Sequence, residues 1–285
     1  MNSLEIKKLN VHLGEFSLKD IDMTIPQGTV MGLVGRNGAG KTTLIKSVIN
    51  MIDADSGAIY YNGKNHYDNE EEVNSMIGMV LDRPIIGEAL KPKKIAKLCK
   101  AVFPVFDEEF YFDGLKKFNI PLNKRIMKLS FGMKKKAELV FALSRKPSIL
   151  VLDEPTAGID PADRLNILDM LRDYLAENEK ASVLFSTHIT SDLDKIADYV
   201  TLIDDGKVVF SKTKDSLEEA YLLFNIDASA ATDDIIKNAI GVHKTSFGYE
   251  GLTDDKTLLT NPHAKCKVPT IEEIMVCFTQ REENK

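Results

Sequence analysis

A glycine-rich segment near the start of the chain has the residue types and spacing of a phosphate-binding loop. Residues Gly35 to Thr42 read G-x-x-x-x-G-K-T between a strand-like run and a helix-like run. There, backbone N–H groups turn inward around the β- and γ-phosphates, Lys41 neutralises their charge, and the Thr42 hydroxyl binds Mg²⁺. We therefore expect a nucleotide site. Its predicted contact residues are Gly35, Arg36, Asn37, Gly38, Ala39, Gly40, Lys41, Thr42 and Thr43.

Two adjacent carboxylates offer catalytic chemistry. Asp153 and Glu154 end the apolar run that begins at residue 149, and ligands in open α/β sheets sit at the carboxyl ends of strands. We expect Asp153 to hold Mg²⁺ through water. We expect Glu154 to orient and deprotonate the water that attacks the γ-phosphate. The alternative is a solvated turn after a buried strand, but the phosphate loop favours the catalytic interpretation.

A histidine follows a second apolar run. His188 comes directly after residues 182–187, and a lone histidine in such a place is more often a hydrogen-bonding partner than a catalyst. If its strand ends at the same sheet edge as Asp153, His188 lies on the γ-phosphate side. There it would hydrogen-bond phosphate or water.

A second helix start also has the features of an anion site. In KLSFGMKKKAELVFAL, Ser130 is placed as an N-cap and Gly132 stands within the first turn. The exposed N–H groups and the positive end of the helix dipole suit a phosphate, although the chain already has a phosphate loop. For Lys134, Lys135 and Lys136 we expect a solvated helix face.

The elements that must position these residues alternate between strand-like and helix-like runs. Residues 29–35 predict a strand that leads into the glycine-rich loop, and residues 41–51 predict the helix after it. Asn62-Gly63 between apolar runs predicts a β-hairpin. Farther along, continuous apolar strands separated by amphipathic helices indicate a parallel sheet covered on both faces, and Asp160 is a clean N-cap for one of these helices.

Between these two parts the hydrophobic period becomes helical. A mainly helical insert is predicted over about 84–145. Its first helix has an apolar face made of Ile95, Leu98, Cys99 and Val102, and a second helix has one made of Phe110, Phe112, Leu115 and Phe118. We therefore expect an α/β fold with an N-terminal antiparallel β part and a helical insert.

The last part of the chain, residues 216–285, predicts a small α+β accessory region. Its expected strands are 224–227, 245–250 and 257–260, and its expected helices are 232–240 and 270–278. The final helix carries Ile271, Ile274, Met275 and Phe278 on one face. That face could serve a dimer contact, and burial within its own chain is the preferred interpretation.

Composition excludes several classes of protein. The 285 residues carry a net charge of −6, which argues against a protein whose main partner is a nucleic acid backbone. The three cysteines have no metal-site spacing and suit a reducing compartment. No run approaches the ~20 apolar residues of a membrane span, and the start lacks a signal-peptide core. We expect a cytosolic chain that reaches a membrane only through a spanning partner.

With these residues in view, the chain resembles the nucleotide-binding subunits of ATP-binding cassette (ABC) transporters. GRNGAGKTT is similar to the Walker A motif, LSFGM to the signature motif and ILVLDEP to the Walker B motif with its catalytic glutamate. AGID is similar to the D-loop, and STH to the segment with the switch histidine. The resemblance covers residues 1 to about 215 in the family's order, and it implies a P-loop ABC ATPase domain there.

The resemblance implies an ATP- and Mg²⁺-dependent ATPase that works as a dimer. Two such domains pack head to tail around two ATP molecules, so Ser130 and Gly132 would contact the γ-phosphate of ATP held by the partner. Asp160 would lie across the interface. The implied partners are a second copy or a homologous cassette and separate transmembrane permease subunits. The chain would then be peripheral on the inner face of the cell membrane.

Two positions depart from the family pattern. The family usually has glutamine where this chain has Asp82, and our hypothesis is that Asp82 still ligates the metal, directly or through water. At the adenine platform the nearest match is Leu13, so Phe16 is the preferred stacking partner; a core phenylalanine is an equal alternative.

LSFGM, Asp82 and the tail TIEEIMVCF together resemble the bacterial branch that exports drugs or antimicrobial peptides. In the family, the groove near Asp82 to Leu90 receives coupling helices of the permease. The alternative is a soluble ABC ATPase that acts as a mechanical or regulatory module, but the chain has neither the fused second cassette nor the long coiled coil of those members. A binding module without turnover is opposed by Glu154 and His188.

Overall fold

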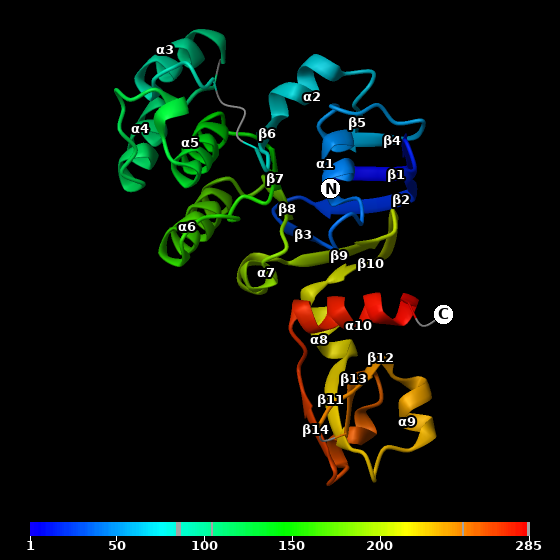
Figure 1. Ribbon diagram of the computed structural model, residues 1–285. Helices are drawn as coiled ribbons and strands as arrows, with labels where there is room; N and C mark the ends of the chain where they lie inside the picture. Colours follow the sequence, from blue (N-terminus) through cyan, green and yellow to red (C-terminus); the bar gives the residue numbers. More distant parts are fainter. Residues whose placement is uncertain (84–86, 104, 247, 284–285) are drawn as a thin grey trace.

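The computed structural model is built around a central sheet with an N-terminal sheet, a helical insert and a C-terminal sheet around it (Figure 1). It describes residues 1–83, 87–103, 105–246 and 248–283. The three sheets and the helices of this part confirm the predicted α/β class. No helix in these ranges is both long enough and apolar enough to cross a lipid bilayer.

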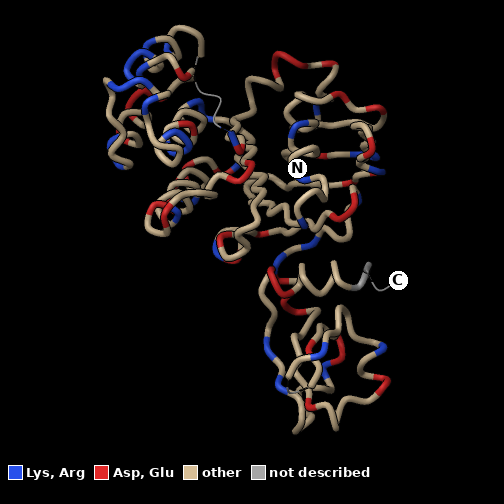
Figure 2. Tube along the Cα trace, viewed as in Figure 1, with Lys and Arg blue, Asp and Glu red and all other residues tan. Residues whose placement is uncertain are grey.

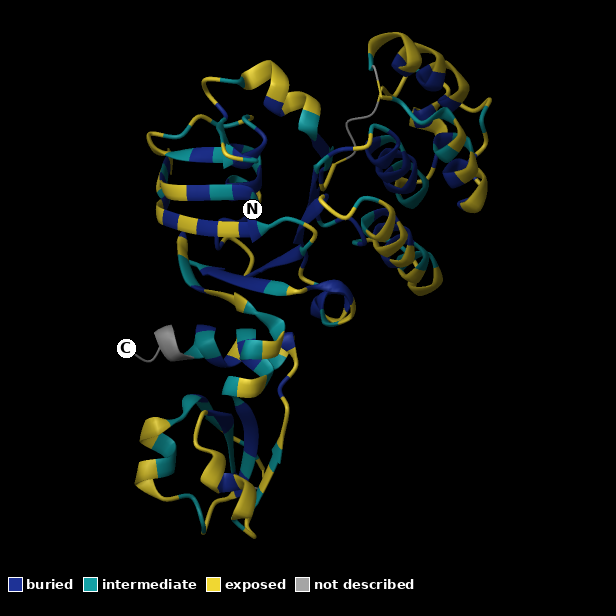
Figure 3. Cartoon of the chain, turned by 180° about the vertical axis from the view of Figure 1, so that it is seen from behind, coloured by how far each residue is buried: buried dark blue, intermediate teal, exposed yellow. Residues whose placement is uncertain are grey.

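The central sheet holds the ends of the predicted site strands. Its strands are β3 (Val30–Val34), β6 (Ile77–Val80), β7 (Ile149–Asp153), β8 (Ser182–Ser186), β9 (Tyr199–Asp204) and β10 (Lys207–Thr213). They lie in the order β10-β9-β3-β8-β7-β6, and every neighbouring pair is parallel except β9 with β10. Strands β3, β7 and β8 are buried at every position, as expected of apolar runs covered on both faces (Figure 3). The associated helices are α1 (Lys41–Val48), α2 (Glu70–Met76), α6 (Pro161–Glu177) and α7 (Thr190–Ile196).

The N-terminal sheet is antiparallel. It consists of β1 (Asn2–Leu13), β2 (Phe16–Pro26), β4 (Ser56–Tyr61) and β5 (Lys64–Asn65), in the order β2-β1-β4-β5. The predicted hairpin is confirmed, because Tyr61 pairs with Lys64 across a two-residue turn. Both turn residues have positive φ, 48° at Asn62 and 82° at Gly63, as the tight hairpin turn requires.

The helical insert lies between β6 and β7. It contains α3 (Pro92–Val102), α4 (Glu108–Lys117), the 3₁₀ turn η1 (Ile126–Lys128) and α5 (Phe131–Ser144); its predicted start at residue 84 is outside the described residues. The predicted helices are confirmed, but the apolar face of α3 is only partly covered. Ile95 and Cys99 are buried, whereas Leu98 is 45% and Val102 68% exposed. Basic residues, Lys and Arg together, are frequent on this part of the molecule (Figure 2).

The C-terminal region forms the third sheet. Its elements are α8 (Lys214–Ala220), β11 (Leu222–Asp227), α9 (Asp233–Asn238), β12 (Ile240–Lys244), β13 (Gly248–Thr253), η2 (Lys256–Thr260), β14 (Ala264–Lys267) and α10 (Ile271–Glu283). The strand order is β12-β13-β11-β14, all antiparallel. The predicted strand 257–260 is wrong. The Asp255 carboxylate accepts a hydrogen bond from the Thr257 N–H at 2.9 Å, which starts the 3₁₀ turn η2 instead.

The final helix packs within its own chain, as the preferred interpretation of its apolar face predicted. Ile271 and Ile274 are buried, and the Phe278 ring meets that of Phe210 edge to face at a centroid distance of 5.2 Å. Helix α10 is also tied to α7, because Thr190 Oγ1 donates to a Glu272 carboxylate oxygen at 3.2 Å. The C-terminal region is therefore joined to the central sheet through α7 and β10.

Candidate functional site

The phosphate loop connects β3 to α1, as its motif requires. Its glycines are needed for shape: Gly40, the N-cap of α1, has φ 111°, and a Cβ there would lie 2.7 Å from Phe16 Cζ. A Cβ at Gly35 would lie 2.2 Å from the Ile203 carbonyl oxygen. The strand, loop and helix therefore place residues 35–43 as one continuous cradle at the carboxyl end of β3.

Lys41 points back into this loop. Its Nζ donates to the carbonyl oxygens of Gly35 at 2.7 Å and Arg36 at 3.1 Å. Burial lowers the pKa of Lys41, and the nearby carboxylates of Glu154 and Asp153 partly oppose that effect. The loop thus holds the ammonium group at its centre, where a bound phosphate would meet it.

Asp153 is fixed at the end of β7 by hydroxyl groups from two other elements. Thr42 Oγ1 donates to one carboxylate oxygen at 3.1 Å, and Ser186 Oγ donates to the other at 3.0 Å. The contact with Ser186 follows from the sheet, because Asp153 and Ser186 are paired across β7 and β8. The oxygens of Thr42 and Asp153 converge as ligands of a hard divalent cation would. Sequence reasoning did not single out Ser186.

Glu154 and His188 form a close pair beside Asp153. His188 Nδ1 lies 2.7 Å from Glu154 Oε2, and the His188 backbone N–H donates to Oε1 at 3.0 Å. Glu154 has φ 52°, a left-handed conformation that is unfavourable for a non-glycine residue. The carboxylate is therefore held by His188 from one side and aimed by its backbone, as a positioned base must be.

These groups share one cavity of about 690 Å³. It is lined by the loop, by the ends of β7 and β8, and by both adenine candidates, Leu13 and Phe16. Phe16 also packs against the core beneath the N-terminal sheet. Its position is therefore compatible both with stacking on adenine and with a role as a core phenylalanine. The lining residues are Leu13, Phe16, Asn37, Gly38, Gly40, Lys41, Thr42, Thr43, Asp82, Asp153, Glu154, Ala157 and His188.

Asp82 reaches the cavity and pairs with a buried lysine that the sequence interpretation missed. Lys135 Nζ lies 3.7 Å from Asp82 Oδ1 and donates to the Glu154 carbonyl oxygen. Its ammonium also lies 5.0 Å from the centre of the Phe131 ring. Burial lowers the pKa of Lys135, and Asp82 is the strongest opposing influence. Lys135 thus links α5, the end of β6 and the backbone of Glu154.

The prediction that the three lysines form a solvated face is wrong. The Lys135 side chain is 0% exposed, and its neighbours also meet carboxylates. Lys134 pairs with Glu88 at 2.8 Å, and Lys136 pairs with Asp163. The reason is tertiary: α5 is enclosed by the loop after β6 and by α6, each of which supplies acidic partners.

Ser130, Gly132 and Asp160 lie apart from the cavity. Ser130 caps α5 by accepting the Met133 N–H at 3.3 Å, and Asp160 caps α6 by accepting the Asp163 N–H at 3.1 Å. Neither Ser130 nor Gly132 is among the described residues that line the cavity. Ser130 and Asp160 are exposed, and a Cβ at Gly132 would be 3.8 Å from the Gly158 carbonyl oxygen. Within one chain, the start of α5, which carries the signature motif, therefore lies close to the D-loop at Gly158. It does not line the cavity at the phosphate loop of the same chain.

Comparison with known proteins agrees with this geometry. A family model described as "ABC transporter" matches residues 18–157. The ABC transporter ATP-binding protein YtrB of Bacillus subtilis (strain 168) is 30% identical over 220 residues, covering 77% of this chain and 75% of YtrB. The bacitracin transport ATP-binding protein BcrA of Bacillus licheniformis is 28% identical over 246 residues, covering 83% and 78%.

Two further matches extend this result. The lantibiotic transport ATP-binding protein SrtF of Streptococcus pyogenes is 29% identical over 225 residues, covering 78% of this chain and 96% of SrtF. A solved ATP-binding subunit of an ABC transporter is 27% identical with a TM-score of 0.69, covering 75% of this chain and 91% of its own. The predicted resemblance is confirmed: the chain belongs to the ABC transporter family, as an ATP-binding and ATP-hydrolysing subunit.

Proposed function

We propose that the chain works as one half of a head-to-tail dimer that hydrolyses ATP with Mg²⁺ and powers export through separate transmembrane subunits. The main support for this proposal is that the start of α5, which carries the signature motif, does not line the cavity at the phosphate loop of its own chain. A second copy, turned head to tail, would bring its Ser130 and Gly132 to the γ-phosphate and complete the site. Asp160, exposed at the start of α6, would lie in that interface and join the two sites.

Within each site the described side chains divide the chemistry of hydrolysis. Glu154 accepts the proton of the attacking water, and the contact with His188 keeps that carboxylate oriented. Lys41 offsets the negative charge of the phosphates. The fit of a divalent cation is supported by the converging oxygens of Thr42 and Asp153. Bound Mg²⁺ would supply charge neutralisation at the β- and γ-phosphates.

Asp82 is proposed as an additional ligand of the cation, most simply through water. It lines the same cavity as Thr42 and Asp153, which supports this role. Its ion pair with Lys135 competes for the same carboxylate. Phe16 is proposed as the adenine platform, because it lines the cavity directly beside Gly40.

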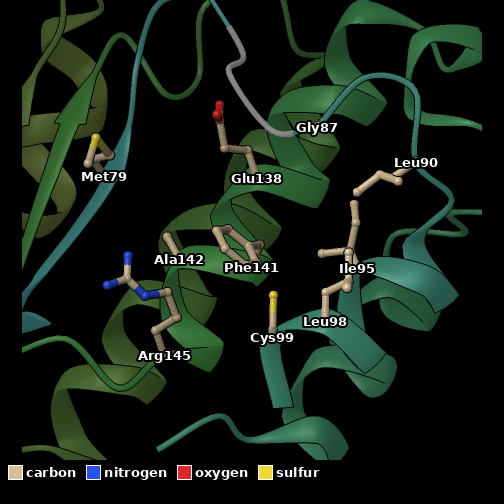
Figure 4. Close-up of a pocket in the computed structure, with 10 residues that line it drawn as sticks. All are labelled: Met79, Gly87, Leu90, Ile95, Leu98, Cys99, Glu138, Phe141, Ala142 and Arg145. Atoms are coloured by element: carbon tan, nitrogen blue, oxygen red, sulfur yellow. The ribbon is translucent and has the colours of Figure 1, made fainter. Parts of the chain in front are cut away.

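A groove beside the helical insert is the proposed seat of the permease. It is a cavity of about 270 Å³ between β6, α3 and α5 (Figure 4). Its lining is mainly apolar, with one carboxylate, Glu138, and one guanidinium, Arg145. An amphipathic helix end from a membrane protein would bury its apolar side chains there. Two relatives are named as lantibiotic and bacitracin transport ATP-binding proteins, which supports a role in transport.

The dimer is tested with purified protein. We expect slow ATP hydrolysis by the wild-type chain, and ATP-trapped dimers without turnover in Glu154→Gln, measured by phosphate release and size-exclusion chromatography. Ser130→Arg should retain ATP binding to the monomer but lose ATP-driven dimerisation and turnover. Loss of monomer binding in Ser130→Arg, or turnover by a strictly monomeric protein, would refute the head-to-tail arrangement.

The permease seat is tested in membranes. Leu98→Glu places a charge in the groove at a side chain that is already partly exposed, so the fold should tolerate it. We expect it to reduce co-purification with the transmembrane subunits while ATP binding is retained. The matched control is Leu259→Glu, in η2, where leucine is 59% exposed and far from the groove. Equal recovery of the permease with both variants would contradict this seat.

A further inference from the structure

Helix α3 carries a dense basic patch on the side away from the permease groove. Lysine occupies five of the ten positions from 91 to 100, in a chain whose net charge is −6. All five are exposed, and they line a hollow of about 870 Å³. The members of this α3 patch are Lys91, Lys93, Lys94, Lys97 and Lys100.

Most of this positive charge is not neutralised by the residues that the structure describes. Lys100 pairs with Glu108 at 2.7 Å. Among the described residues, the other four lysines of the patch have no carboxylate within ion-pair distance. An acidic chain that gathers unpaired lysines on one helix presents a surface that attracts anions locally, within about 10 Å at ordinary salt.

Exposed aliphatic side chains lie on the groove side of α3, opposite the lysines, and just after the helix. Leu98 and Val102 on α3 are 45% and 68% exposed, and Val105, just after the helix, is 59% exposed. A helix with lysines on one face and exposed aliphatic groups on the other is typical of surfaces that lie at the membrane interface. We infer that the α3 edge, formed by the α3 patch with Val102 and Val105, rests on anionic phospholipid headgroups.

This inference rests on the proposed function, because the permease groove and the patch share α3 as a wall. Ile95, Leu98 and Cys99 face the groove, and Lys93, Lys94 and Lys97 line the hollow. A membrane protein seated in the groove therefore brings α3 to the bilayer. The C-terminal sheet lies at the opposite end of the molecule (Figure 1). Lysine side chains can extend to the headgroups while their stems cover apolar surface.

The test uses the purified full chain and two kinds of vesicle, phosphatidylcholine alone and phosphatidylcholine with an equal amount of phosphatidylglycerol. Each lysine near an anionic surface strengthens binding by about fivefold. A triple variant, Lys93→Gln with Lys94→Gln and Lys97→Gln, should therefore lower the partition coefficient on anionic vesicles by about 100-fold. Its ATP hydrolysis should be unchanged, because none of these lysines lines the nucleotide cavity among the described residues.

The matched control removes three exposed lysines from strands on the other side of the molecule. Lys8→Gln, Lys19→Gln and Lys207→Gln change the net charge equally but lie on β1, β2 and β10. We expect this control to bind anionic vesicles within about twofold of wild type. Salt that shortens the Debye length to about 3 Å should release the wild-type protein. A further variant, Val102→Ser with Val105→Ser, should weaken binding to anionic vesicles without changing its salt dependence.

The outcomes separate the inference from its alternatives. Equal binding to both kinds of vesicle, equal losses in the two triple variants, or no binding by wild type would overturn it. Binding to polyglutamate but not to anionic vesicles would show that the partner of the patch is an acidic protein segment instead. Normal ATP-driven dimerisation without vesicle binding refutes the lipid contact alone, whereas vesicle binding without ATP-driven dimerisation refutes the proposed dimer alone.

Discussion

Replacing Lys135 by methionine should separate catalysis from stability. Methionine keeps the length of the side chain but removes the donor to the Glu154 carbonyl oxygen and the partner of Asp82. A hydrogen bond from a charged donor contributes about 1.5–3 kcal/mol. The pair with Asp82 adds about 1 kcal/mol or less, because that carboxylate is 60% exposed. Against these losses, methionine avoids the cost of burying an ammonium group, which is several kcal/mol.

The two sides nearly cancel, so the free energy of unfolding should change by no more than about 1–2 kcal/mol in urea titrations. Turnover should change more. Glu154 has a left-handed backbone, and Lys135 holds its carbonyl group in that conformation. A displacement of the base by about 1 Å costs on the order of 100-fold in rate. We expect kcat for ATP hydrolysis to fall between about tenfold and 100-fold while KM stays within about twofold.

Lys134→Met is the matched control for this experiment. Lys134 precedes Lys135 in α5 and pairs with Glu88 rather than with the Glu154 backbone, so its variant should keep kcat within about twofold. Asp82→Asn separates the two contacts of Lys135, because it removes the ion pair and leaves the hydrogen bond to the Glu154 carbonyl. An unchanged kcat in Lys135→Met, or an equal loss in Lys134→Met, would show that this lysine does not position the base.

Three further predictions concern the metal, the C-terminal helix and its thiol. Asp82→Ala should raise the Mg²⁺ concentration for half-maximal hydrolysis by about tenfold, and an unchanged Mg²⁺ dependence would exclude Asp82 as a ligand. Phe278→Ala removes the edge-to-face contact with Phe210 and should cost about 2 kcal/mol in urea unfolding while ATP binding is retained; no loss would mean that α10 contributes little to the core. Burial raises the pKa of Cys277 from 9.0 to about 11, so the folded state favours the neutral thiol. The contribution of the neutral thiol to the free energy of unfolding is full below pH 9 and declines as pH rises toward 11. Relative to Cys277→Ala, the wild-type protein should lose about 2–3 kcal/mol over this range. Parallel pH profiles of unfolding for the two proteins would contradict this prediction.

Features encoded by consecutive residues were predictable. The phosphate loop is a single run between a strand and a helix, so its type and place could be read directly. The meeting of Glu154 and His188 was also within reach, because both follow continuous apolar runs. Adjacent parallel strands end at the same sheet edge, and β7 and β8 are such neighbours. The caps at Ser130 and Asp160 depend on local geometry in the same way.

Features that depend on distant partners were not predictable. Three consecutive lysines usually form a solvated face, and only the position of α5 against the loop after β6 reveals the acidic partner of Lys135. The sequence predicted the apolar face of α3, but the spacing of Leu98 and Val102 carries no information about what covers them. The strand predicted at 257–260 failed for a local reason instead, because the Asp255 side chain accepts a hydrogen bond from the Thr257 N–H and so competes for the backbone.

The packing of α10 has a consequence for shortening the protein. Although the motifs end well before residue 215, Ile271, Ile274 and Cys277 belong to the same continuous apolar core as Leu193 and Phe210. A chain cut at residue 215 would leave that surface open to water, and at about 25 cal/mol per Å² such exposure favours aggregation. We therefore expect a piece that retains the last helix to be more soluble than one that ends at residue 215, so the boundary for expression differs from the boundary of the motifs.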